Sequence, residues 1–492
     1  MQTRRLTAGA AVLIFVAVAC GQKPNVSEQV PEGFAQINPA TGEVIDPDTG
    51  EVIGGGTTGD LTGGAGGTSF GGDSGTTGGG DTTTTTGGGD TSDVGTTDTS
   101  GAPTGGDTTG VTDKTIKIGS HAPLTGAAPV PSDSAEKGKD LYFRWLAHNK
   151  KSINGRTGEV VLKNDNYNPS QAVAVCKEMV QQDKVFLLSG AAGTDQIVAC
   201  AKYAASVNVP YLSAGVTEIG LSTLSNYFAT TMTYPDQGPL LADFLTTKLG
   251  AKSEKNGMLR FDTNNFQDAH DTFADAMSDA GASLDYDRAV RKTANKSDAD
   301  TVVQEMKAAG IENVYVLTSP VWFLQVLDSA QKQLYTPQWV GVGITMTFDT
   351  VATVGCRDGT LSQAKFFAPF PAWIDSNKFD PDFQKAVREF FASSECPANQ
   401  PGCGDDFMLL GWQGNITAAA LLNLPGRNLT RERFVYYAER ARGIKSPVGP
   451  TLNFAPDDRF GASQVHVSEA QCSGYKAGDN RWHTIQSFVS DF

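Results

Sequence analysis

Val185-Phe-Leu-Leu-Ser-Gly-Ala-Ala-Gly-Thr194 is the stretch that decides the fold, because a short apolar run leads through a turn of small residues into a helical pattern. Six further apolar runs have the character of strands, and segments with helical apolar spacing separate them. Strands that alternate with helices in this way predict an α/β fold, with parallel sheets covered by helices on both faces. The seven candidate strands are residues 115–119, 159–163, 185–190, 209–214, 257–261, 313–317 and 338–343.

The part of the chain that carries these strands is too long for one hydrophobic core, since cores stop growing at roughly 250–300 residues, and we expect two lobes. In doubly wound lobes, ligands bind beyond the carboxyl ends of the strands, where loops lead into helix N-termini. Thr194 is the strongest candidate for ligand contact, because a hydroxyl and free backbone N–H groups at a helix N-terminus suit a carboxylate. The alternative is an ordinary N-cap, the commonest role of a threonine at such a position.

Residues 1–19 have the pattern of a secretory leader. Arg4 and Arg5 precede a short apolar run, and small residues lead up to Cys20. The pattern resembles the signal of bacterial lipoproteins, in which this cysteine is acylated and becomes the first residue of the mature chain. The alternative is an uncleaved anchor helix, but about 11 apolar residues are too few to span a bilayer. We therefore predict an extracytoplasmic protein that a lipid on Cys20 attaches to the outer face of the cell membrane.

Residues 20–110 are expected to form a disordered tether. Between Pro24 and Asp113 the chain has no Lys or Arg, and from Gly54 onward it is almost entirely Gly, Thr, Asp and Ser. Such a segment cannot bury enough apolar surface to offset its ordering entropy. It carries most of the net charge of −15, so the remainder gives no reason to expect a nucleic acid partner. A short repeat at 38–53 is interpreted as linker rather than as a calcium site.

The six cysteines that follow Cys20 indicate three disulfides, because an even count is typical of an exported chain. None has the spacing of a zinc finger, and we expect neither a metal nor a cofactor. Cys396 and Cys403 bracket a short segment with two prolines, which favours a bridge between them. The alternative is six buried free thiols. Pairing of the remaining four stays open from spacing alone: Cys176, Cys200, Cys356 and Cys472.

Six motifs resemble type I periplasmic binding proteins in order and spacing. Within that family the chain is most similar to the leucine/isoleucine/valine-binding receptors of ABC transporters, over roughly residues 114–465. The motifs are Ile116-Lys-Ile-Gly119, Ala122-Pro-Leu-Thr-Gly126, Asp165-Asn-Tyr-Asn-Pro-Ser-Gln-Ala-Val-Ala174, Leu188-Ser-Gly190, Pro210-Tyr-Leu-Ser-Ala-Gly215 and Gln237-Gly-Pro239.

This resemblance implies two Rossmann-like lobes joined by three crossovers, with a small ligand clamped between them and delivered to an ABC transporter permease. Lobe 1 would contain residues 111–234 and 371–444, and lobe 2 residues 235–370 and 445–492. The same topology places Cys176 and Cys200 on neighbouring helices, which makes them a plausible bridge and leaves Cys356 with Cys472. The disulfide of the related receptors would fall on Tyr167 and Gly193, so it is absent here.

The resemblance also implies specific ligand contacts. Thr194 matches the residue that holds the substrate carboxylate in amino-acid receptors. Gly215 and Thr217 occupy positions where the family presents a backbone carbonyl and a hydroxyl to the ligand; the alternative is a loop that merely turns.

Aromatic residues and one histidine complete the candidate set. Tyr234 lies beside the first crossover, where its ring would line the cleft or pack at the hinge. Phe266 and Trp322 follow strands of lobe 2 and would either close over an apolar group or pack in the core. His121, expected in the turn after the first strand, is the only histidine placed near the cleft, and loop packing is the alternative to ligand contact.

The chain departs from the amino-acid receptors where they hold the ammonium group. They place a carboxylate after the strand aligned with 338–343, whereas Gly341-Val-Gly-Ile-Thr-Met346 contains no acid, and Ser319-Pro320 stands where an aromatic hydroxyl is expected. A buried ammonium without an anionic partner is costly. Either Asp262 or Asp268 replaces the missing acid, or the ligand is a carboxylate or amide without an ammonium.

Two other classes of function were weighed. A secreted hydrolase is disfavoured, because the chain has no Gly-x-Ser-x-Gly elbow and its five histidines form no metal-spaced pair. We therefore expect a binding protein and not an enzyme. A receptor that serves a sensor instead of a transporter remains an alternative, and we expect a monomer.

Overall fold

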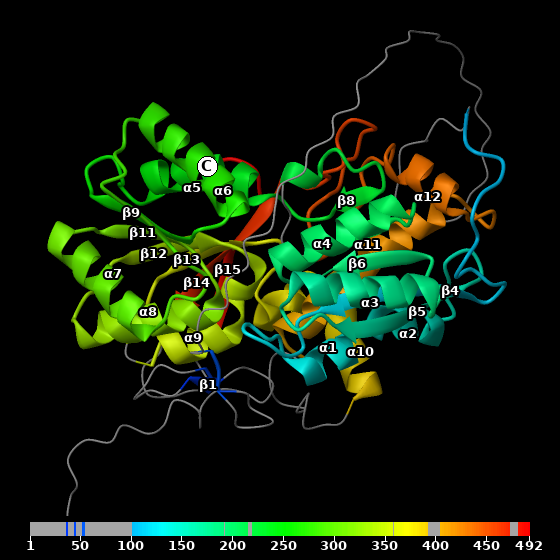
Figure 1. Cartoon of the computed structure of the whole chain (residues 1–492), viewed down its shortest axis with the longest axis horizontal. Helices are drawn as coiled ribbons and strands as arrows, with labels where there is room; N and C mark the ends of the chain where they lie inside the picture. The colour runs from blue at the N-terminus through cyan, green and yellow to red at the C-terminus, as the bar shows by residue number, and fades with distance from the viewer. Residues whose placement is uncertain are drawn as a thin grey trace, which may run out of the picture.

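The computed structural model describes residues 101–190, 192–214, 219–357, 359–391, 404–472 and 481–492, together with three short strands earlier in the chain. Two α/β lobes stand side by side, each built around its own sheet (Figure 1). The fold class expected from the alternation of strands and helices is therefore confirmed.

Lobe 1 contains a five-stranded parallel sheet with the order β5-β4-β6-β7-β8. Helices α3 and α4 lie side by side on one face, and α1, α2, α11 and α12 cover the other. The strands are β4 (Thr115–Ala122), β5 (Thr157–Asn164), β6 (Leu187–Gly190), β7 (Tyr211–Ser213) and β8 (Tyr227–Ala229). The helices are α1 (Ser132–Gly138), α2 (Leu141–His148), α3 (Pro169–Gln181), α4 (Thr194–Ser206), α10 (Pro381–Phe390), α11 (Asp406–Asn423) and α12 (Arg431–Ala438).

Lobe 2 contains a seven-stranded sheet with the order β10-β9-β11-β12-β13-β14-β15, in which β14 runs antiparallel to both of its neighbours. Figure 1 shows α5 and α6 on one face and α7, α8 and α9 on the other. The strands are β9 (Asn256–Phe261), β10 (Tyr286–Val290), β11 (Asn313–Leu317), β12 (Gln338–Val342), β13 (Lys365–Ala368), β14 (Val465–Gln471) and β15 (Arg481–Val489). The helices are α5 (Tyr234–Lys248), α6 (Asn264–Asp279), α7 (Lys296–Ala309), α8 (Pro320–Lys332) and α9 (Asp349–Gly355).

All seven strands predicted from apolar runs are present. Every residue of β9 and β11 is buried, as a central strand between two helical layers must be. Of the five strands in the two large sheets that escaped prediction, β8, β10 and β15 lie at sheet edges, and β10 has three exposed residues in a row. The other two, β13 and β14, are interior strands. A continuous apolar run marks a strand only where both faces are covered, so edge strands are missed.

One predicted lobe boundary is wrong. Residues 445–462 were expected in lobe 2, but Ile444 bridges Leu452 and Leu452 bridges Ala462 within the core of lobe 1. The Phe454 ring packs edge-on against Phe228 of β8, with 5.6 Å between the ring centroids. The chain therefore returns to lobe 2 only at β14, and the three connections between lobes follow β8, follow β13 and precede β14.

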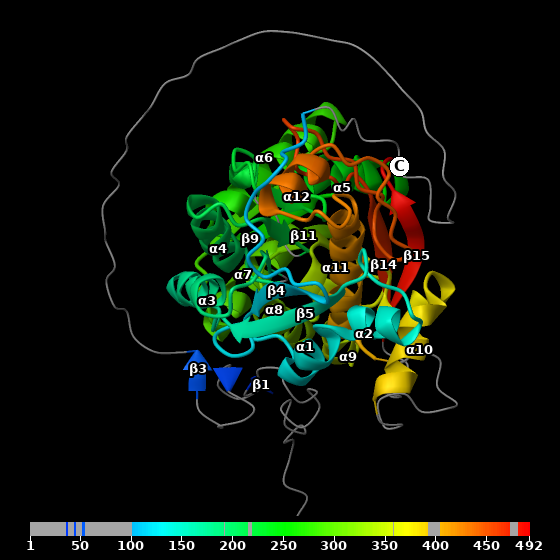
Figure 2. The same ribbon diagram turned by 90° about the vertical axis from the view of Figure 1, so that its right-hand side faces the viewer.

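The folded unit also begins earlier than expected. Residues 101–110 run along α12, where the Asp107 carboxylate pairs with Arg431 and the Asp107 amide donates a hydrogen bond to Glu432 at 2.8 Å (Figure 2). The Arg433 guanidinium donates to the Pro103 carbonyl at 2.9 Å. These contacts attach the last part of the predicted tether to lobe 1.

The prediction of disorder is wrong for a second part of the tether. Strands β1 (Gln36–Ile37), β2 (Val44–Ile45) and β3 (Val52–Gly54) form a small antiparallel sheet over the short repeat. The remainder of 20–100, including Cys20, lies outside the described residues. Within the part of the chain that the structure describes, no helix is long and apolar enough to cross a membrane.

Two disulfides stabilise the lobes. Cys176 and Cys200 join α3 to α4, and Cys356 and Cys472 join the end of α9 to the end of β14. Both are the pairings that the family topology implied. Cys396 and Cys403 lie outside the described residues, so their bridge stays a prediction.

Candidate functional site

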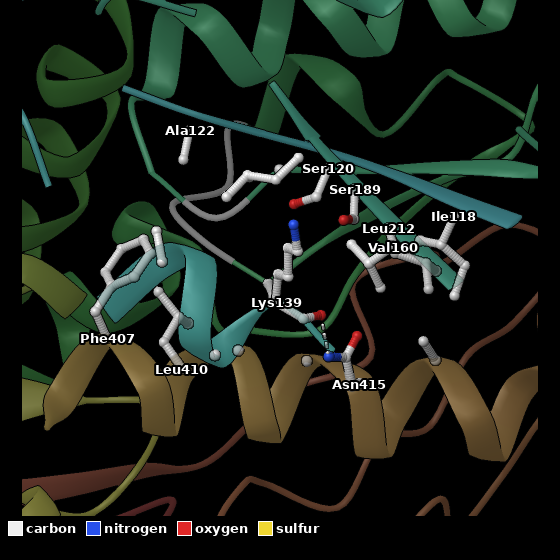
Figure 3. Close-up of a pocket in the computed structure, with 18 of the residues that line it drawn as sticks. Ile118, Ser120, Ala122, Lys139, Val160, Ser189, Leu212, Phe407, Leu410 and Asn415 are labelled. Atoms are coloured by element: carbon white, nitrogen blue, oxygen red, sulfur yellow. Dashed lines mark hydrogen bonds between the residues drawn. The ribbon is translucent and has the colours of Figure 1, made fainter. Parts of the chain in front are cut away.

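A pocket lies between the two lobes, at the carboxyl ends of strands from both sheets. Its empty space measures about 890 Å³, including the solvent at its mouth. Lobe 1 contributes the loops after β4 and β5 and the start of α4; lobe 2 contributes the segments after β9, β10, β11 and β12. We call this the interlobe pocket. A second cavity, inside lobe 1, shares none of its described lining residues (Figure 3).

The lobe 1 wall is centred on the N-terminus of α4. Gly193 is the N-cap with φ +82°, a left-handed conformation that a glycine adopts without strain. Thr194 is therefore the first residue of the helix rather than its cap, and it lines the pocket. The first backbone N–H groups of an α-helix have no partner within the helix, so this wall offers hydrogen-bond donors to a ligand.

Two helices of lobe 2 begin at the opposite wall. Thr263 caps α6 by accepting a hydrogen bond from the Phe266 amide at 3.3 Å, and Ser319 caps α8 in the same way from the Trp322 amide at 3.3 Å. Both capping residues line the pocket. With α4, three helix N-termini converge on it, and each contributes a positive partial charge. The pocket is thus electrostatically suited to an anion.

Lys292 adds a full positive charge to the pocket. It follows β10 in lobe 2, and its ammonium pairs with the Asp195 carboxylate in the first turn of α4. Both side chains line the pocket, with 35% of Lys292 and 43% of Asp195 exposed. Since the two residues belong to different lobes, this ion pair links the lobes across the pocket.

Aromatic and apolar side chains form the rest of the wall. The Tyr234 ring packs edge-on against Phe266 with centroids 5.4 Å apart, and Phe261 and Phe348 line the same space. Burial raises the pKa of Tyr234 and raises that of Tyr167 to about 12, so both phenols stay neutral near pH 7 and can donate a hydrogen bond. The pocket combines an apolar body with positive polar ends.

A comparison with models of protein families shows to which family this chain belongs. A model described as periplasmic binding protein matches residues 115–476, which is most of the chain. The chain belongs to the periplasmic binding protein family. It has the two-lobed type I fold, as the sequence motifs implied. No curated protein sequence matches this periplasmic binding protein significantly.

This chain aligns with nearly the whole length of several solved structures that have the same fold. A leucine-binding protein from Thermotoga maritima has a TM-score of 0.58 and 15% identity over 72% of this chain and 95% of its own. A solute-binding protein of an ABC transporter from Rhodopseudomonas palustris, in complex with 3,4-dihydroxybenzoic acid, has a TM-score of 0.61 and 16% identity over 77% and 99%. A fatty acid ABC transporter substrate-binding protein from Thermomonospora curvata has a TM-score of 0.62 and 18% identity over 80% and 96%.

The structure of this periplasmic binding protein brings Thr194, Tyr234 and Phe266 together around the pocket, and their contact with a ligand stays a prediction. Gly215 and Thr217 lie outside the described residues, so their contacts stay predictions. The alternatives of hinge and core packing also apply in part, because Tyr234 and Phe266 are only 8% and 9% exposed.

Trp322 and His121 do not line the interlobe pocket, and both predictions of ligand contact are corrected. Trp322 lies in the first turn of α8, 2% exposed, where its indole N–H donates to the Asn295 carbonyl at 3.2 Å and its ring packs against Phe261. It thus supports a wall residue from behind.

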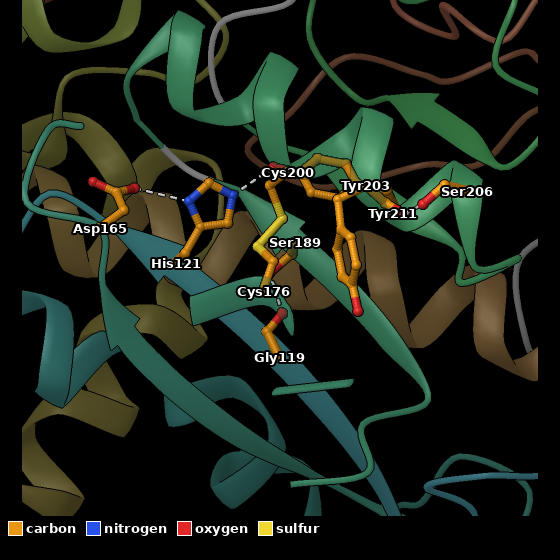
Figure 4. The surroundings of a disulfide bond; sticks show 9 residues. All are labelled: Gly119, His121, Asp165, Cys176, Ser189, Cys200, Tyr203, Ser206 and Tyr211. Carbon is orange, nitrogen blue, oxygen red and sulfur yellow. Dashed lines mark hydrogen bonds and ion pairs between the residues drawn. A yellow bond between two sulfur atoms is a disulfide. The ribbon is translucent and has the colours of Figure 1, made fainter. Parts of the chain in front are cut away.

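His121 is the penultimate residue of β4 and not part of a turn. Its Nδ1 lies 2.8 Å from an Asp165 carboxylate oxygen and its Nε2 lies 2.7 Å from the Tyr211 hydroxyl (Figure 4). The Cys176–Cys200 sulfurs come close enough to His121 to suggest a metal site, but both are consumed in the disulfide. The cluster is a satisfied hydrogen-bond network in the core.

Neither acid proposed to replace the missing carboxylate lines the pocket. Asp262 is exposed, and Asp268 lies on α6 but is not among the lining residues. The sequence reasoning missed Lys292 and Asp195. Lys292 follows the edge strand β10, and recognising that strand would have placed Lys292 at a carboxyl end beside the cleft.

Proposed function

We propose that this chain is the extracytoplasmic receptor of an ABC importer, held at the membrane by a lipid on Cys20, and that it captures a small carboxylate with an apolar body and no ammonium group. One observation carries the choice of ligand: three helix N-termini and Lys292 face the pocket, while its only described lining acid, Asp195, is already paired with Lys292. A branched-chain amino acid would bring an ammonium that finds no unpaired acid among the described lining residues.

The ligand carboxylate would bind at the N-terminus of α4, where the Thr194 hydroxyl and the unpaired amides of the first turn can donate hydrogen bonds. Lys292 would approach from lobe 2 and supply the charge. The apolar body would then lie against Phe261, Phe266 and Phe348. The solutes named for the neighbours from Rhodopseudomonas and Thermomonospora, an aromatic acid and fatty acids, belong to this chemical class.

Capture would proceed by closure of the lobes. A ligand that contacts α4 in lobe 1 and Lys292 in lobe 2 binds the closed form more tightly than the open one, so it shifts the population toward closure. The closed receptor would then dock on the permease. If the partner is a sensor instead of a permease, it would recognise the same closed form.

A thermal-shift screen tests the proposal, because a solute that binds only the folded protein raises its melting temperature. The mature chain from residue 20, with Cys20→Ser to keep it free of lipid, would be screened against benzoate, octanoate, 4-methylpentanoate, leucine and isoleucine. Stabilisation by the acids but not by the amino acids is expected, and Thr194→Ala should weaken it. Stabilisation by leucine alone would contradict the choice of ligand while leaving the receptor assignment intact.

A further inference from the structure

The second cavity lies inside lobe 1, between the sheet and the helices α1 and α11. Its empty space is about 710 Å³, including solvent at its opening. One wall consists of aliphatic side chains on neighbouring strands, among them Ile118 on β4, Val160 on β5 and Leu187 on β6. We call this the lobe 1 cavity.

Small residues on the helices explain why the space stays open. Gly138 of α1 and Gly411 of α11 let the two helices touch, since a Cβ atom added at Gly411 would lie 2.8 Å from the Gly138 carbonyl oxygen. Further along α11, a Cβ atom at Gly414 would meet only Ala214, at 3.3 Å, and the next lining residues are Asn415, whose amide donates to the Lys139 carbonyl at 2.7 Å, and Ala418. The helices are thus in contact with each other while no large side chain fills the space toward the sheet.

Polar groups gather at one end of this apolar space. Lys139, which directly follows α1, extends toward the hydroxyl groups of Ser120 and Ser189 (Figure 3). Ser120 is partly exposed although β4 is a central strand, because its side chain faces the cavity. The Ser189 hydroxyl makes only a long hydrogen bond, 3.4 Å, to the Gly119 carbonyl.

The Lys139 ammonium is held by an ion pair that a ligand carboxylate would have to displace. Its ion-pair partner is Glu136, one turn earlier, at 2.6 Å, and half of the Glu136 side chain is exposed. An ion pair of this exposed kind adds little to stability, so its exchange for a ligand carboxylate has a small cost. Close-packed protein interiors rarely leave apolar space unfilled, and where they do, it accommodates apolar molecules.

We infer that the lobe 1 cavity is a second binding site, for an aliphatic monocarboxylate of medium chain length. The carboxylate would bind the Lys139 ammonium and the hydroxyls of Ser120 and Ser189, and the alkyl chain would lie along Ile118, Val160 and the glycine face of α11. The inference does not depend on the proposed function, because none of the described lining residues is shared with the interlobe pocket.

Octanoate is the probe, titrated calorimetrically into the mature chain and three single variants. Lys139→Met removes the charge but keeps the length of the side chain. Lys137→Met is the matched control, since Lys137 lies in the last turn of α1, two residues before Lys139, pairs with Asp133 and does not line the cavity. Lys292→Met weakens the interlobe pocket alone. Methyl NMR spectra of Leu187 and Leu212, both lining residues, report where octanoate binds.

We expect octanoate to shift the Leu187 and Leu212 methyl resonances in the wild type, in Lys137→Met and in Lys292→Met, and Lys139→Met to weaken this response at least tenfold. A Gly414→Leu variant, which places a side chain in the cavity, should abolish it without weakening interlobe binding. Equal responses in Lys139→Met and Lys137→Met would overturn the inference, as would unshifted Leu187 and Leu212 resonances at saturating octanoate.

Discussion

Replacing Asp195 with Asn should strengthen the binding of simple carboxylates. A ligand carboxylate that reaches Lys292 would lie near the Asp195 carboxylate, which pairs with the same ammonium. At about 5 Å, two like charges repel by about 0.8 kcal/mol at the dielectric constant of water and about 3 kcal/mol at an effective value of 20. With 43% of Asp195 exposed, the true value lies between these limits.

The variant also loses the ion pair between the lobes, which contributes at most about 1 kcal/mol to closure for side chains this exposed. The net expectation is a dissociation constant that is three- to tenfold lower, which corresponds to a gain in binding free energy of about 0.7–1.4 kcal/mol. Asn keeps the size of the side chain and its ability to accept hydrogen bonds at the start of α4, so folding should be unaffected.

The assay is calorimetric titration with two ligands that differ only in the ammonium group, 4-methylpentanoate and leucine. If Asp195 instead holds a ligand ammonium, the same substitution should weaken the binding of leucine at least tenfold. The matched control is Asp382→Asn, which removes a lysine-paired aspartate from the first turn of α10, away from both cavities. Weaker binding of 4-methylpentanoate by Asp195→Asn, with Asp382→Asn unchanged, would refute the reasoning.

Three further predictions concern stability and location. Replacing both Cys176 and Cys200 with Ala should lower the free energy of unfolding by about 3.5 kcal/mol, the loop-closure value for a separation of 24 residues, and urea denaturation with a loss under about 1 kcal/mol would contradict it. Burial lowers the pKa of His466 from 6.5 to about 3, so the stability from its neutral form is complete above pH 6.5 and is lost as the pH falls toward 3. His466→Leu should therefore flatten the decline of unfolding free energy between pH 6 and pH 4 by about 1.4 kcal/mol per pH unit, and parallel profiles would count against this. Cys20→Ser should move the protein from the membrane fraction to the soluble fraction after export, whereas retention in the membrane would exclude lipid anchoring through Cys20.

Much of the architecture was predictable because it is encoded locally. Central strands such as β9 and β11 are buried on both faces and appear as continuous apolar runs. The turn of small residues before Thr194 likewise predicts a helix N-terminus directly after the carboxyl end of a strand. Edge strands carry no such signal, and with β10 unrecognised the position of Lys292 went unnoticed.

Side-chain roles were harder to predict than elements. His121 sits one residue before the end of β4, where a shift of one position turns a side chain from one face of the sheet to the other. Trp322 lies in the first turn of α8, whose start directly after β11 decides that its ring faces the core. His121 turned inward because Asp165 and Tyr211 satisfy both ring nitrogens there. Such partners, from strands far apart in the sequence, are not visible in a local pattern.

The sequence by itself determined the family and the two α/β lobes, because hydrophobic runs, turns and motif order are properties of short segments. The pairing of Cys176 with Cys200 followed only from the topology that the family resemblance implied. The tertiary structure alone decided that Lys292 meets Asp195, 97 residues earlier in the chain, and that Lys139 faces Ser120 and Ser189 across an unfilled core. These arrangements arise from how helices and lobes pack, and packing depends on residue pairs that no local stretch contains.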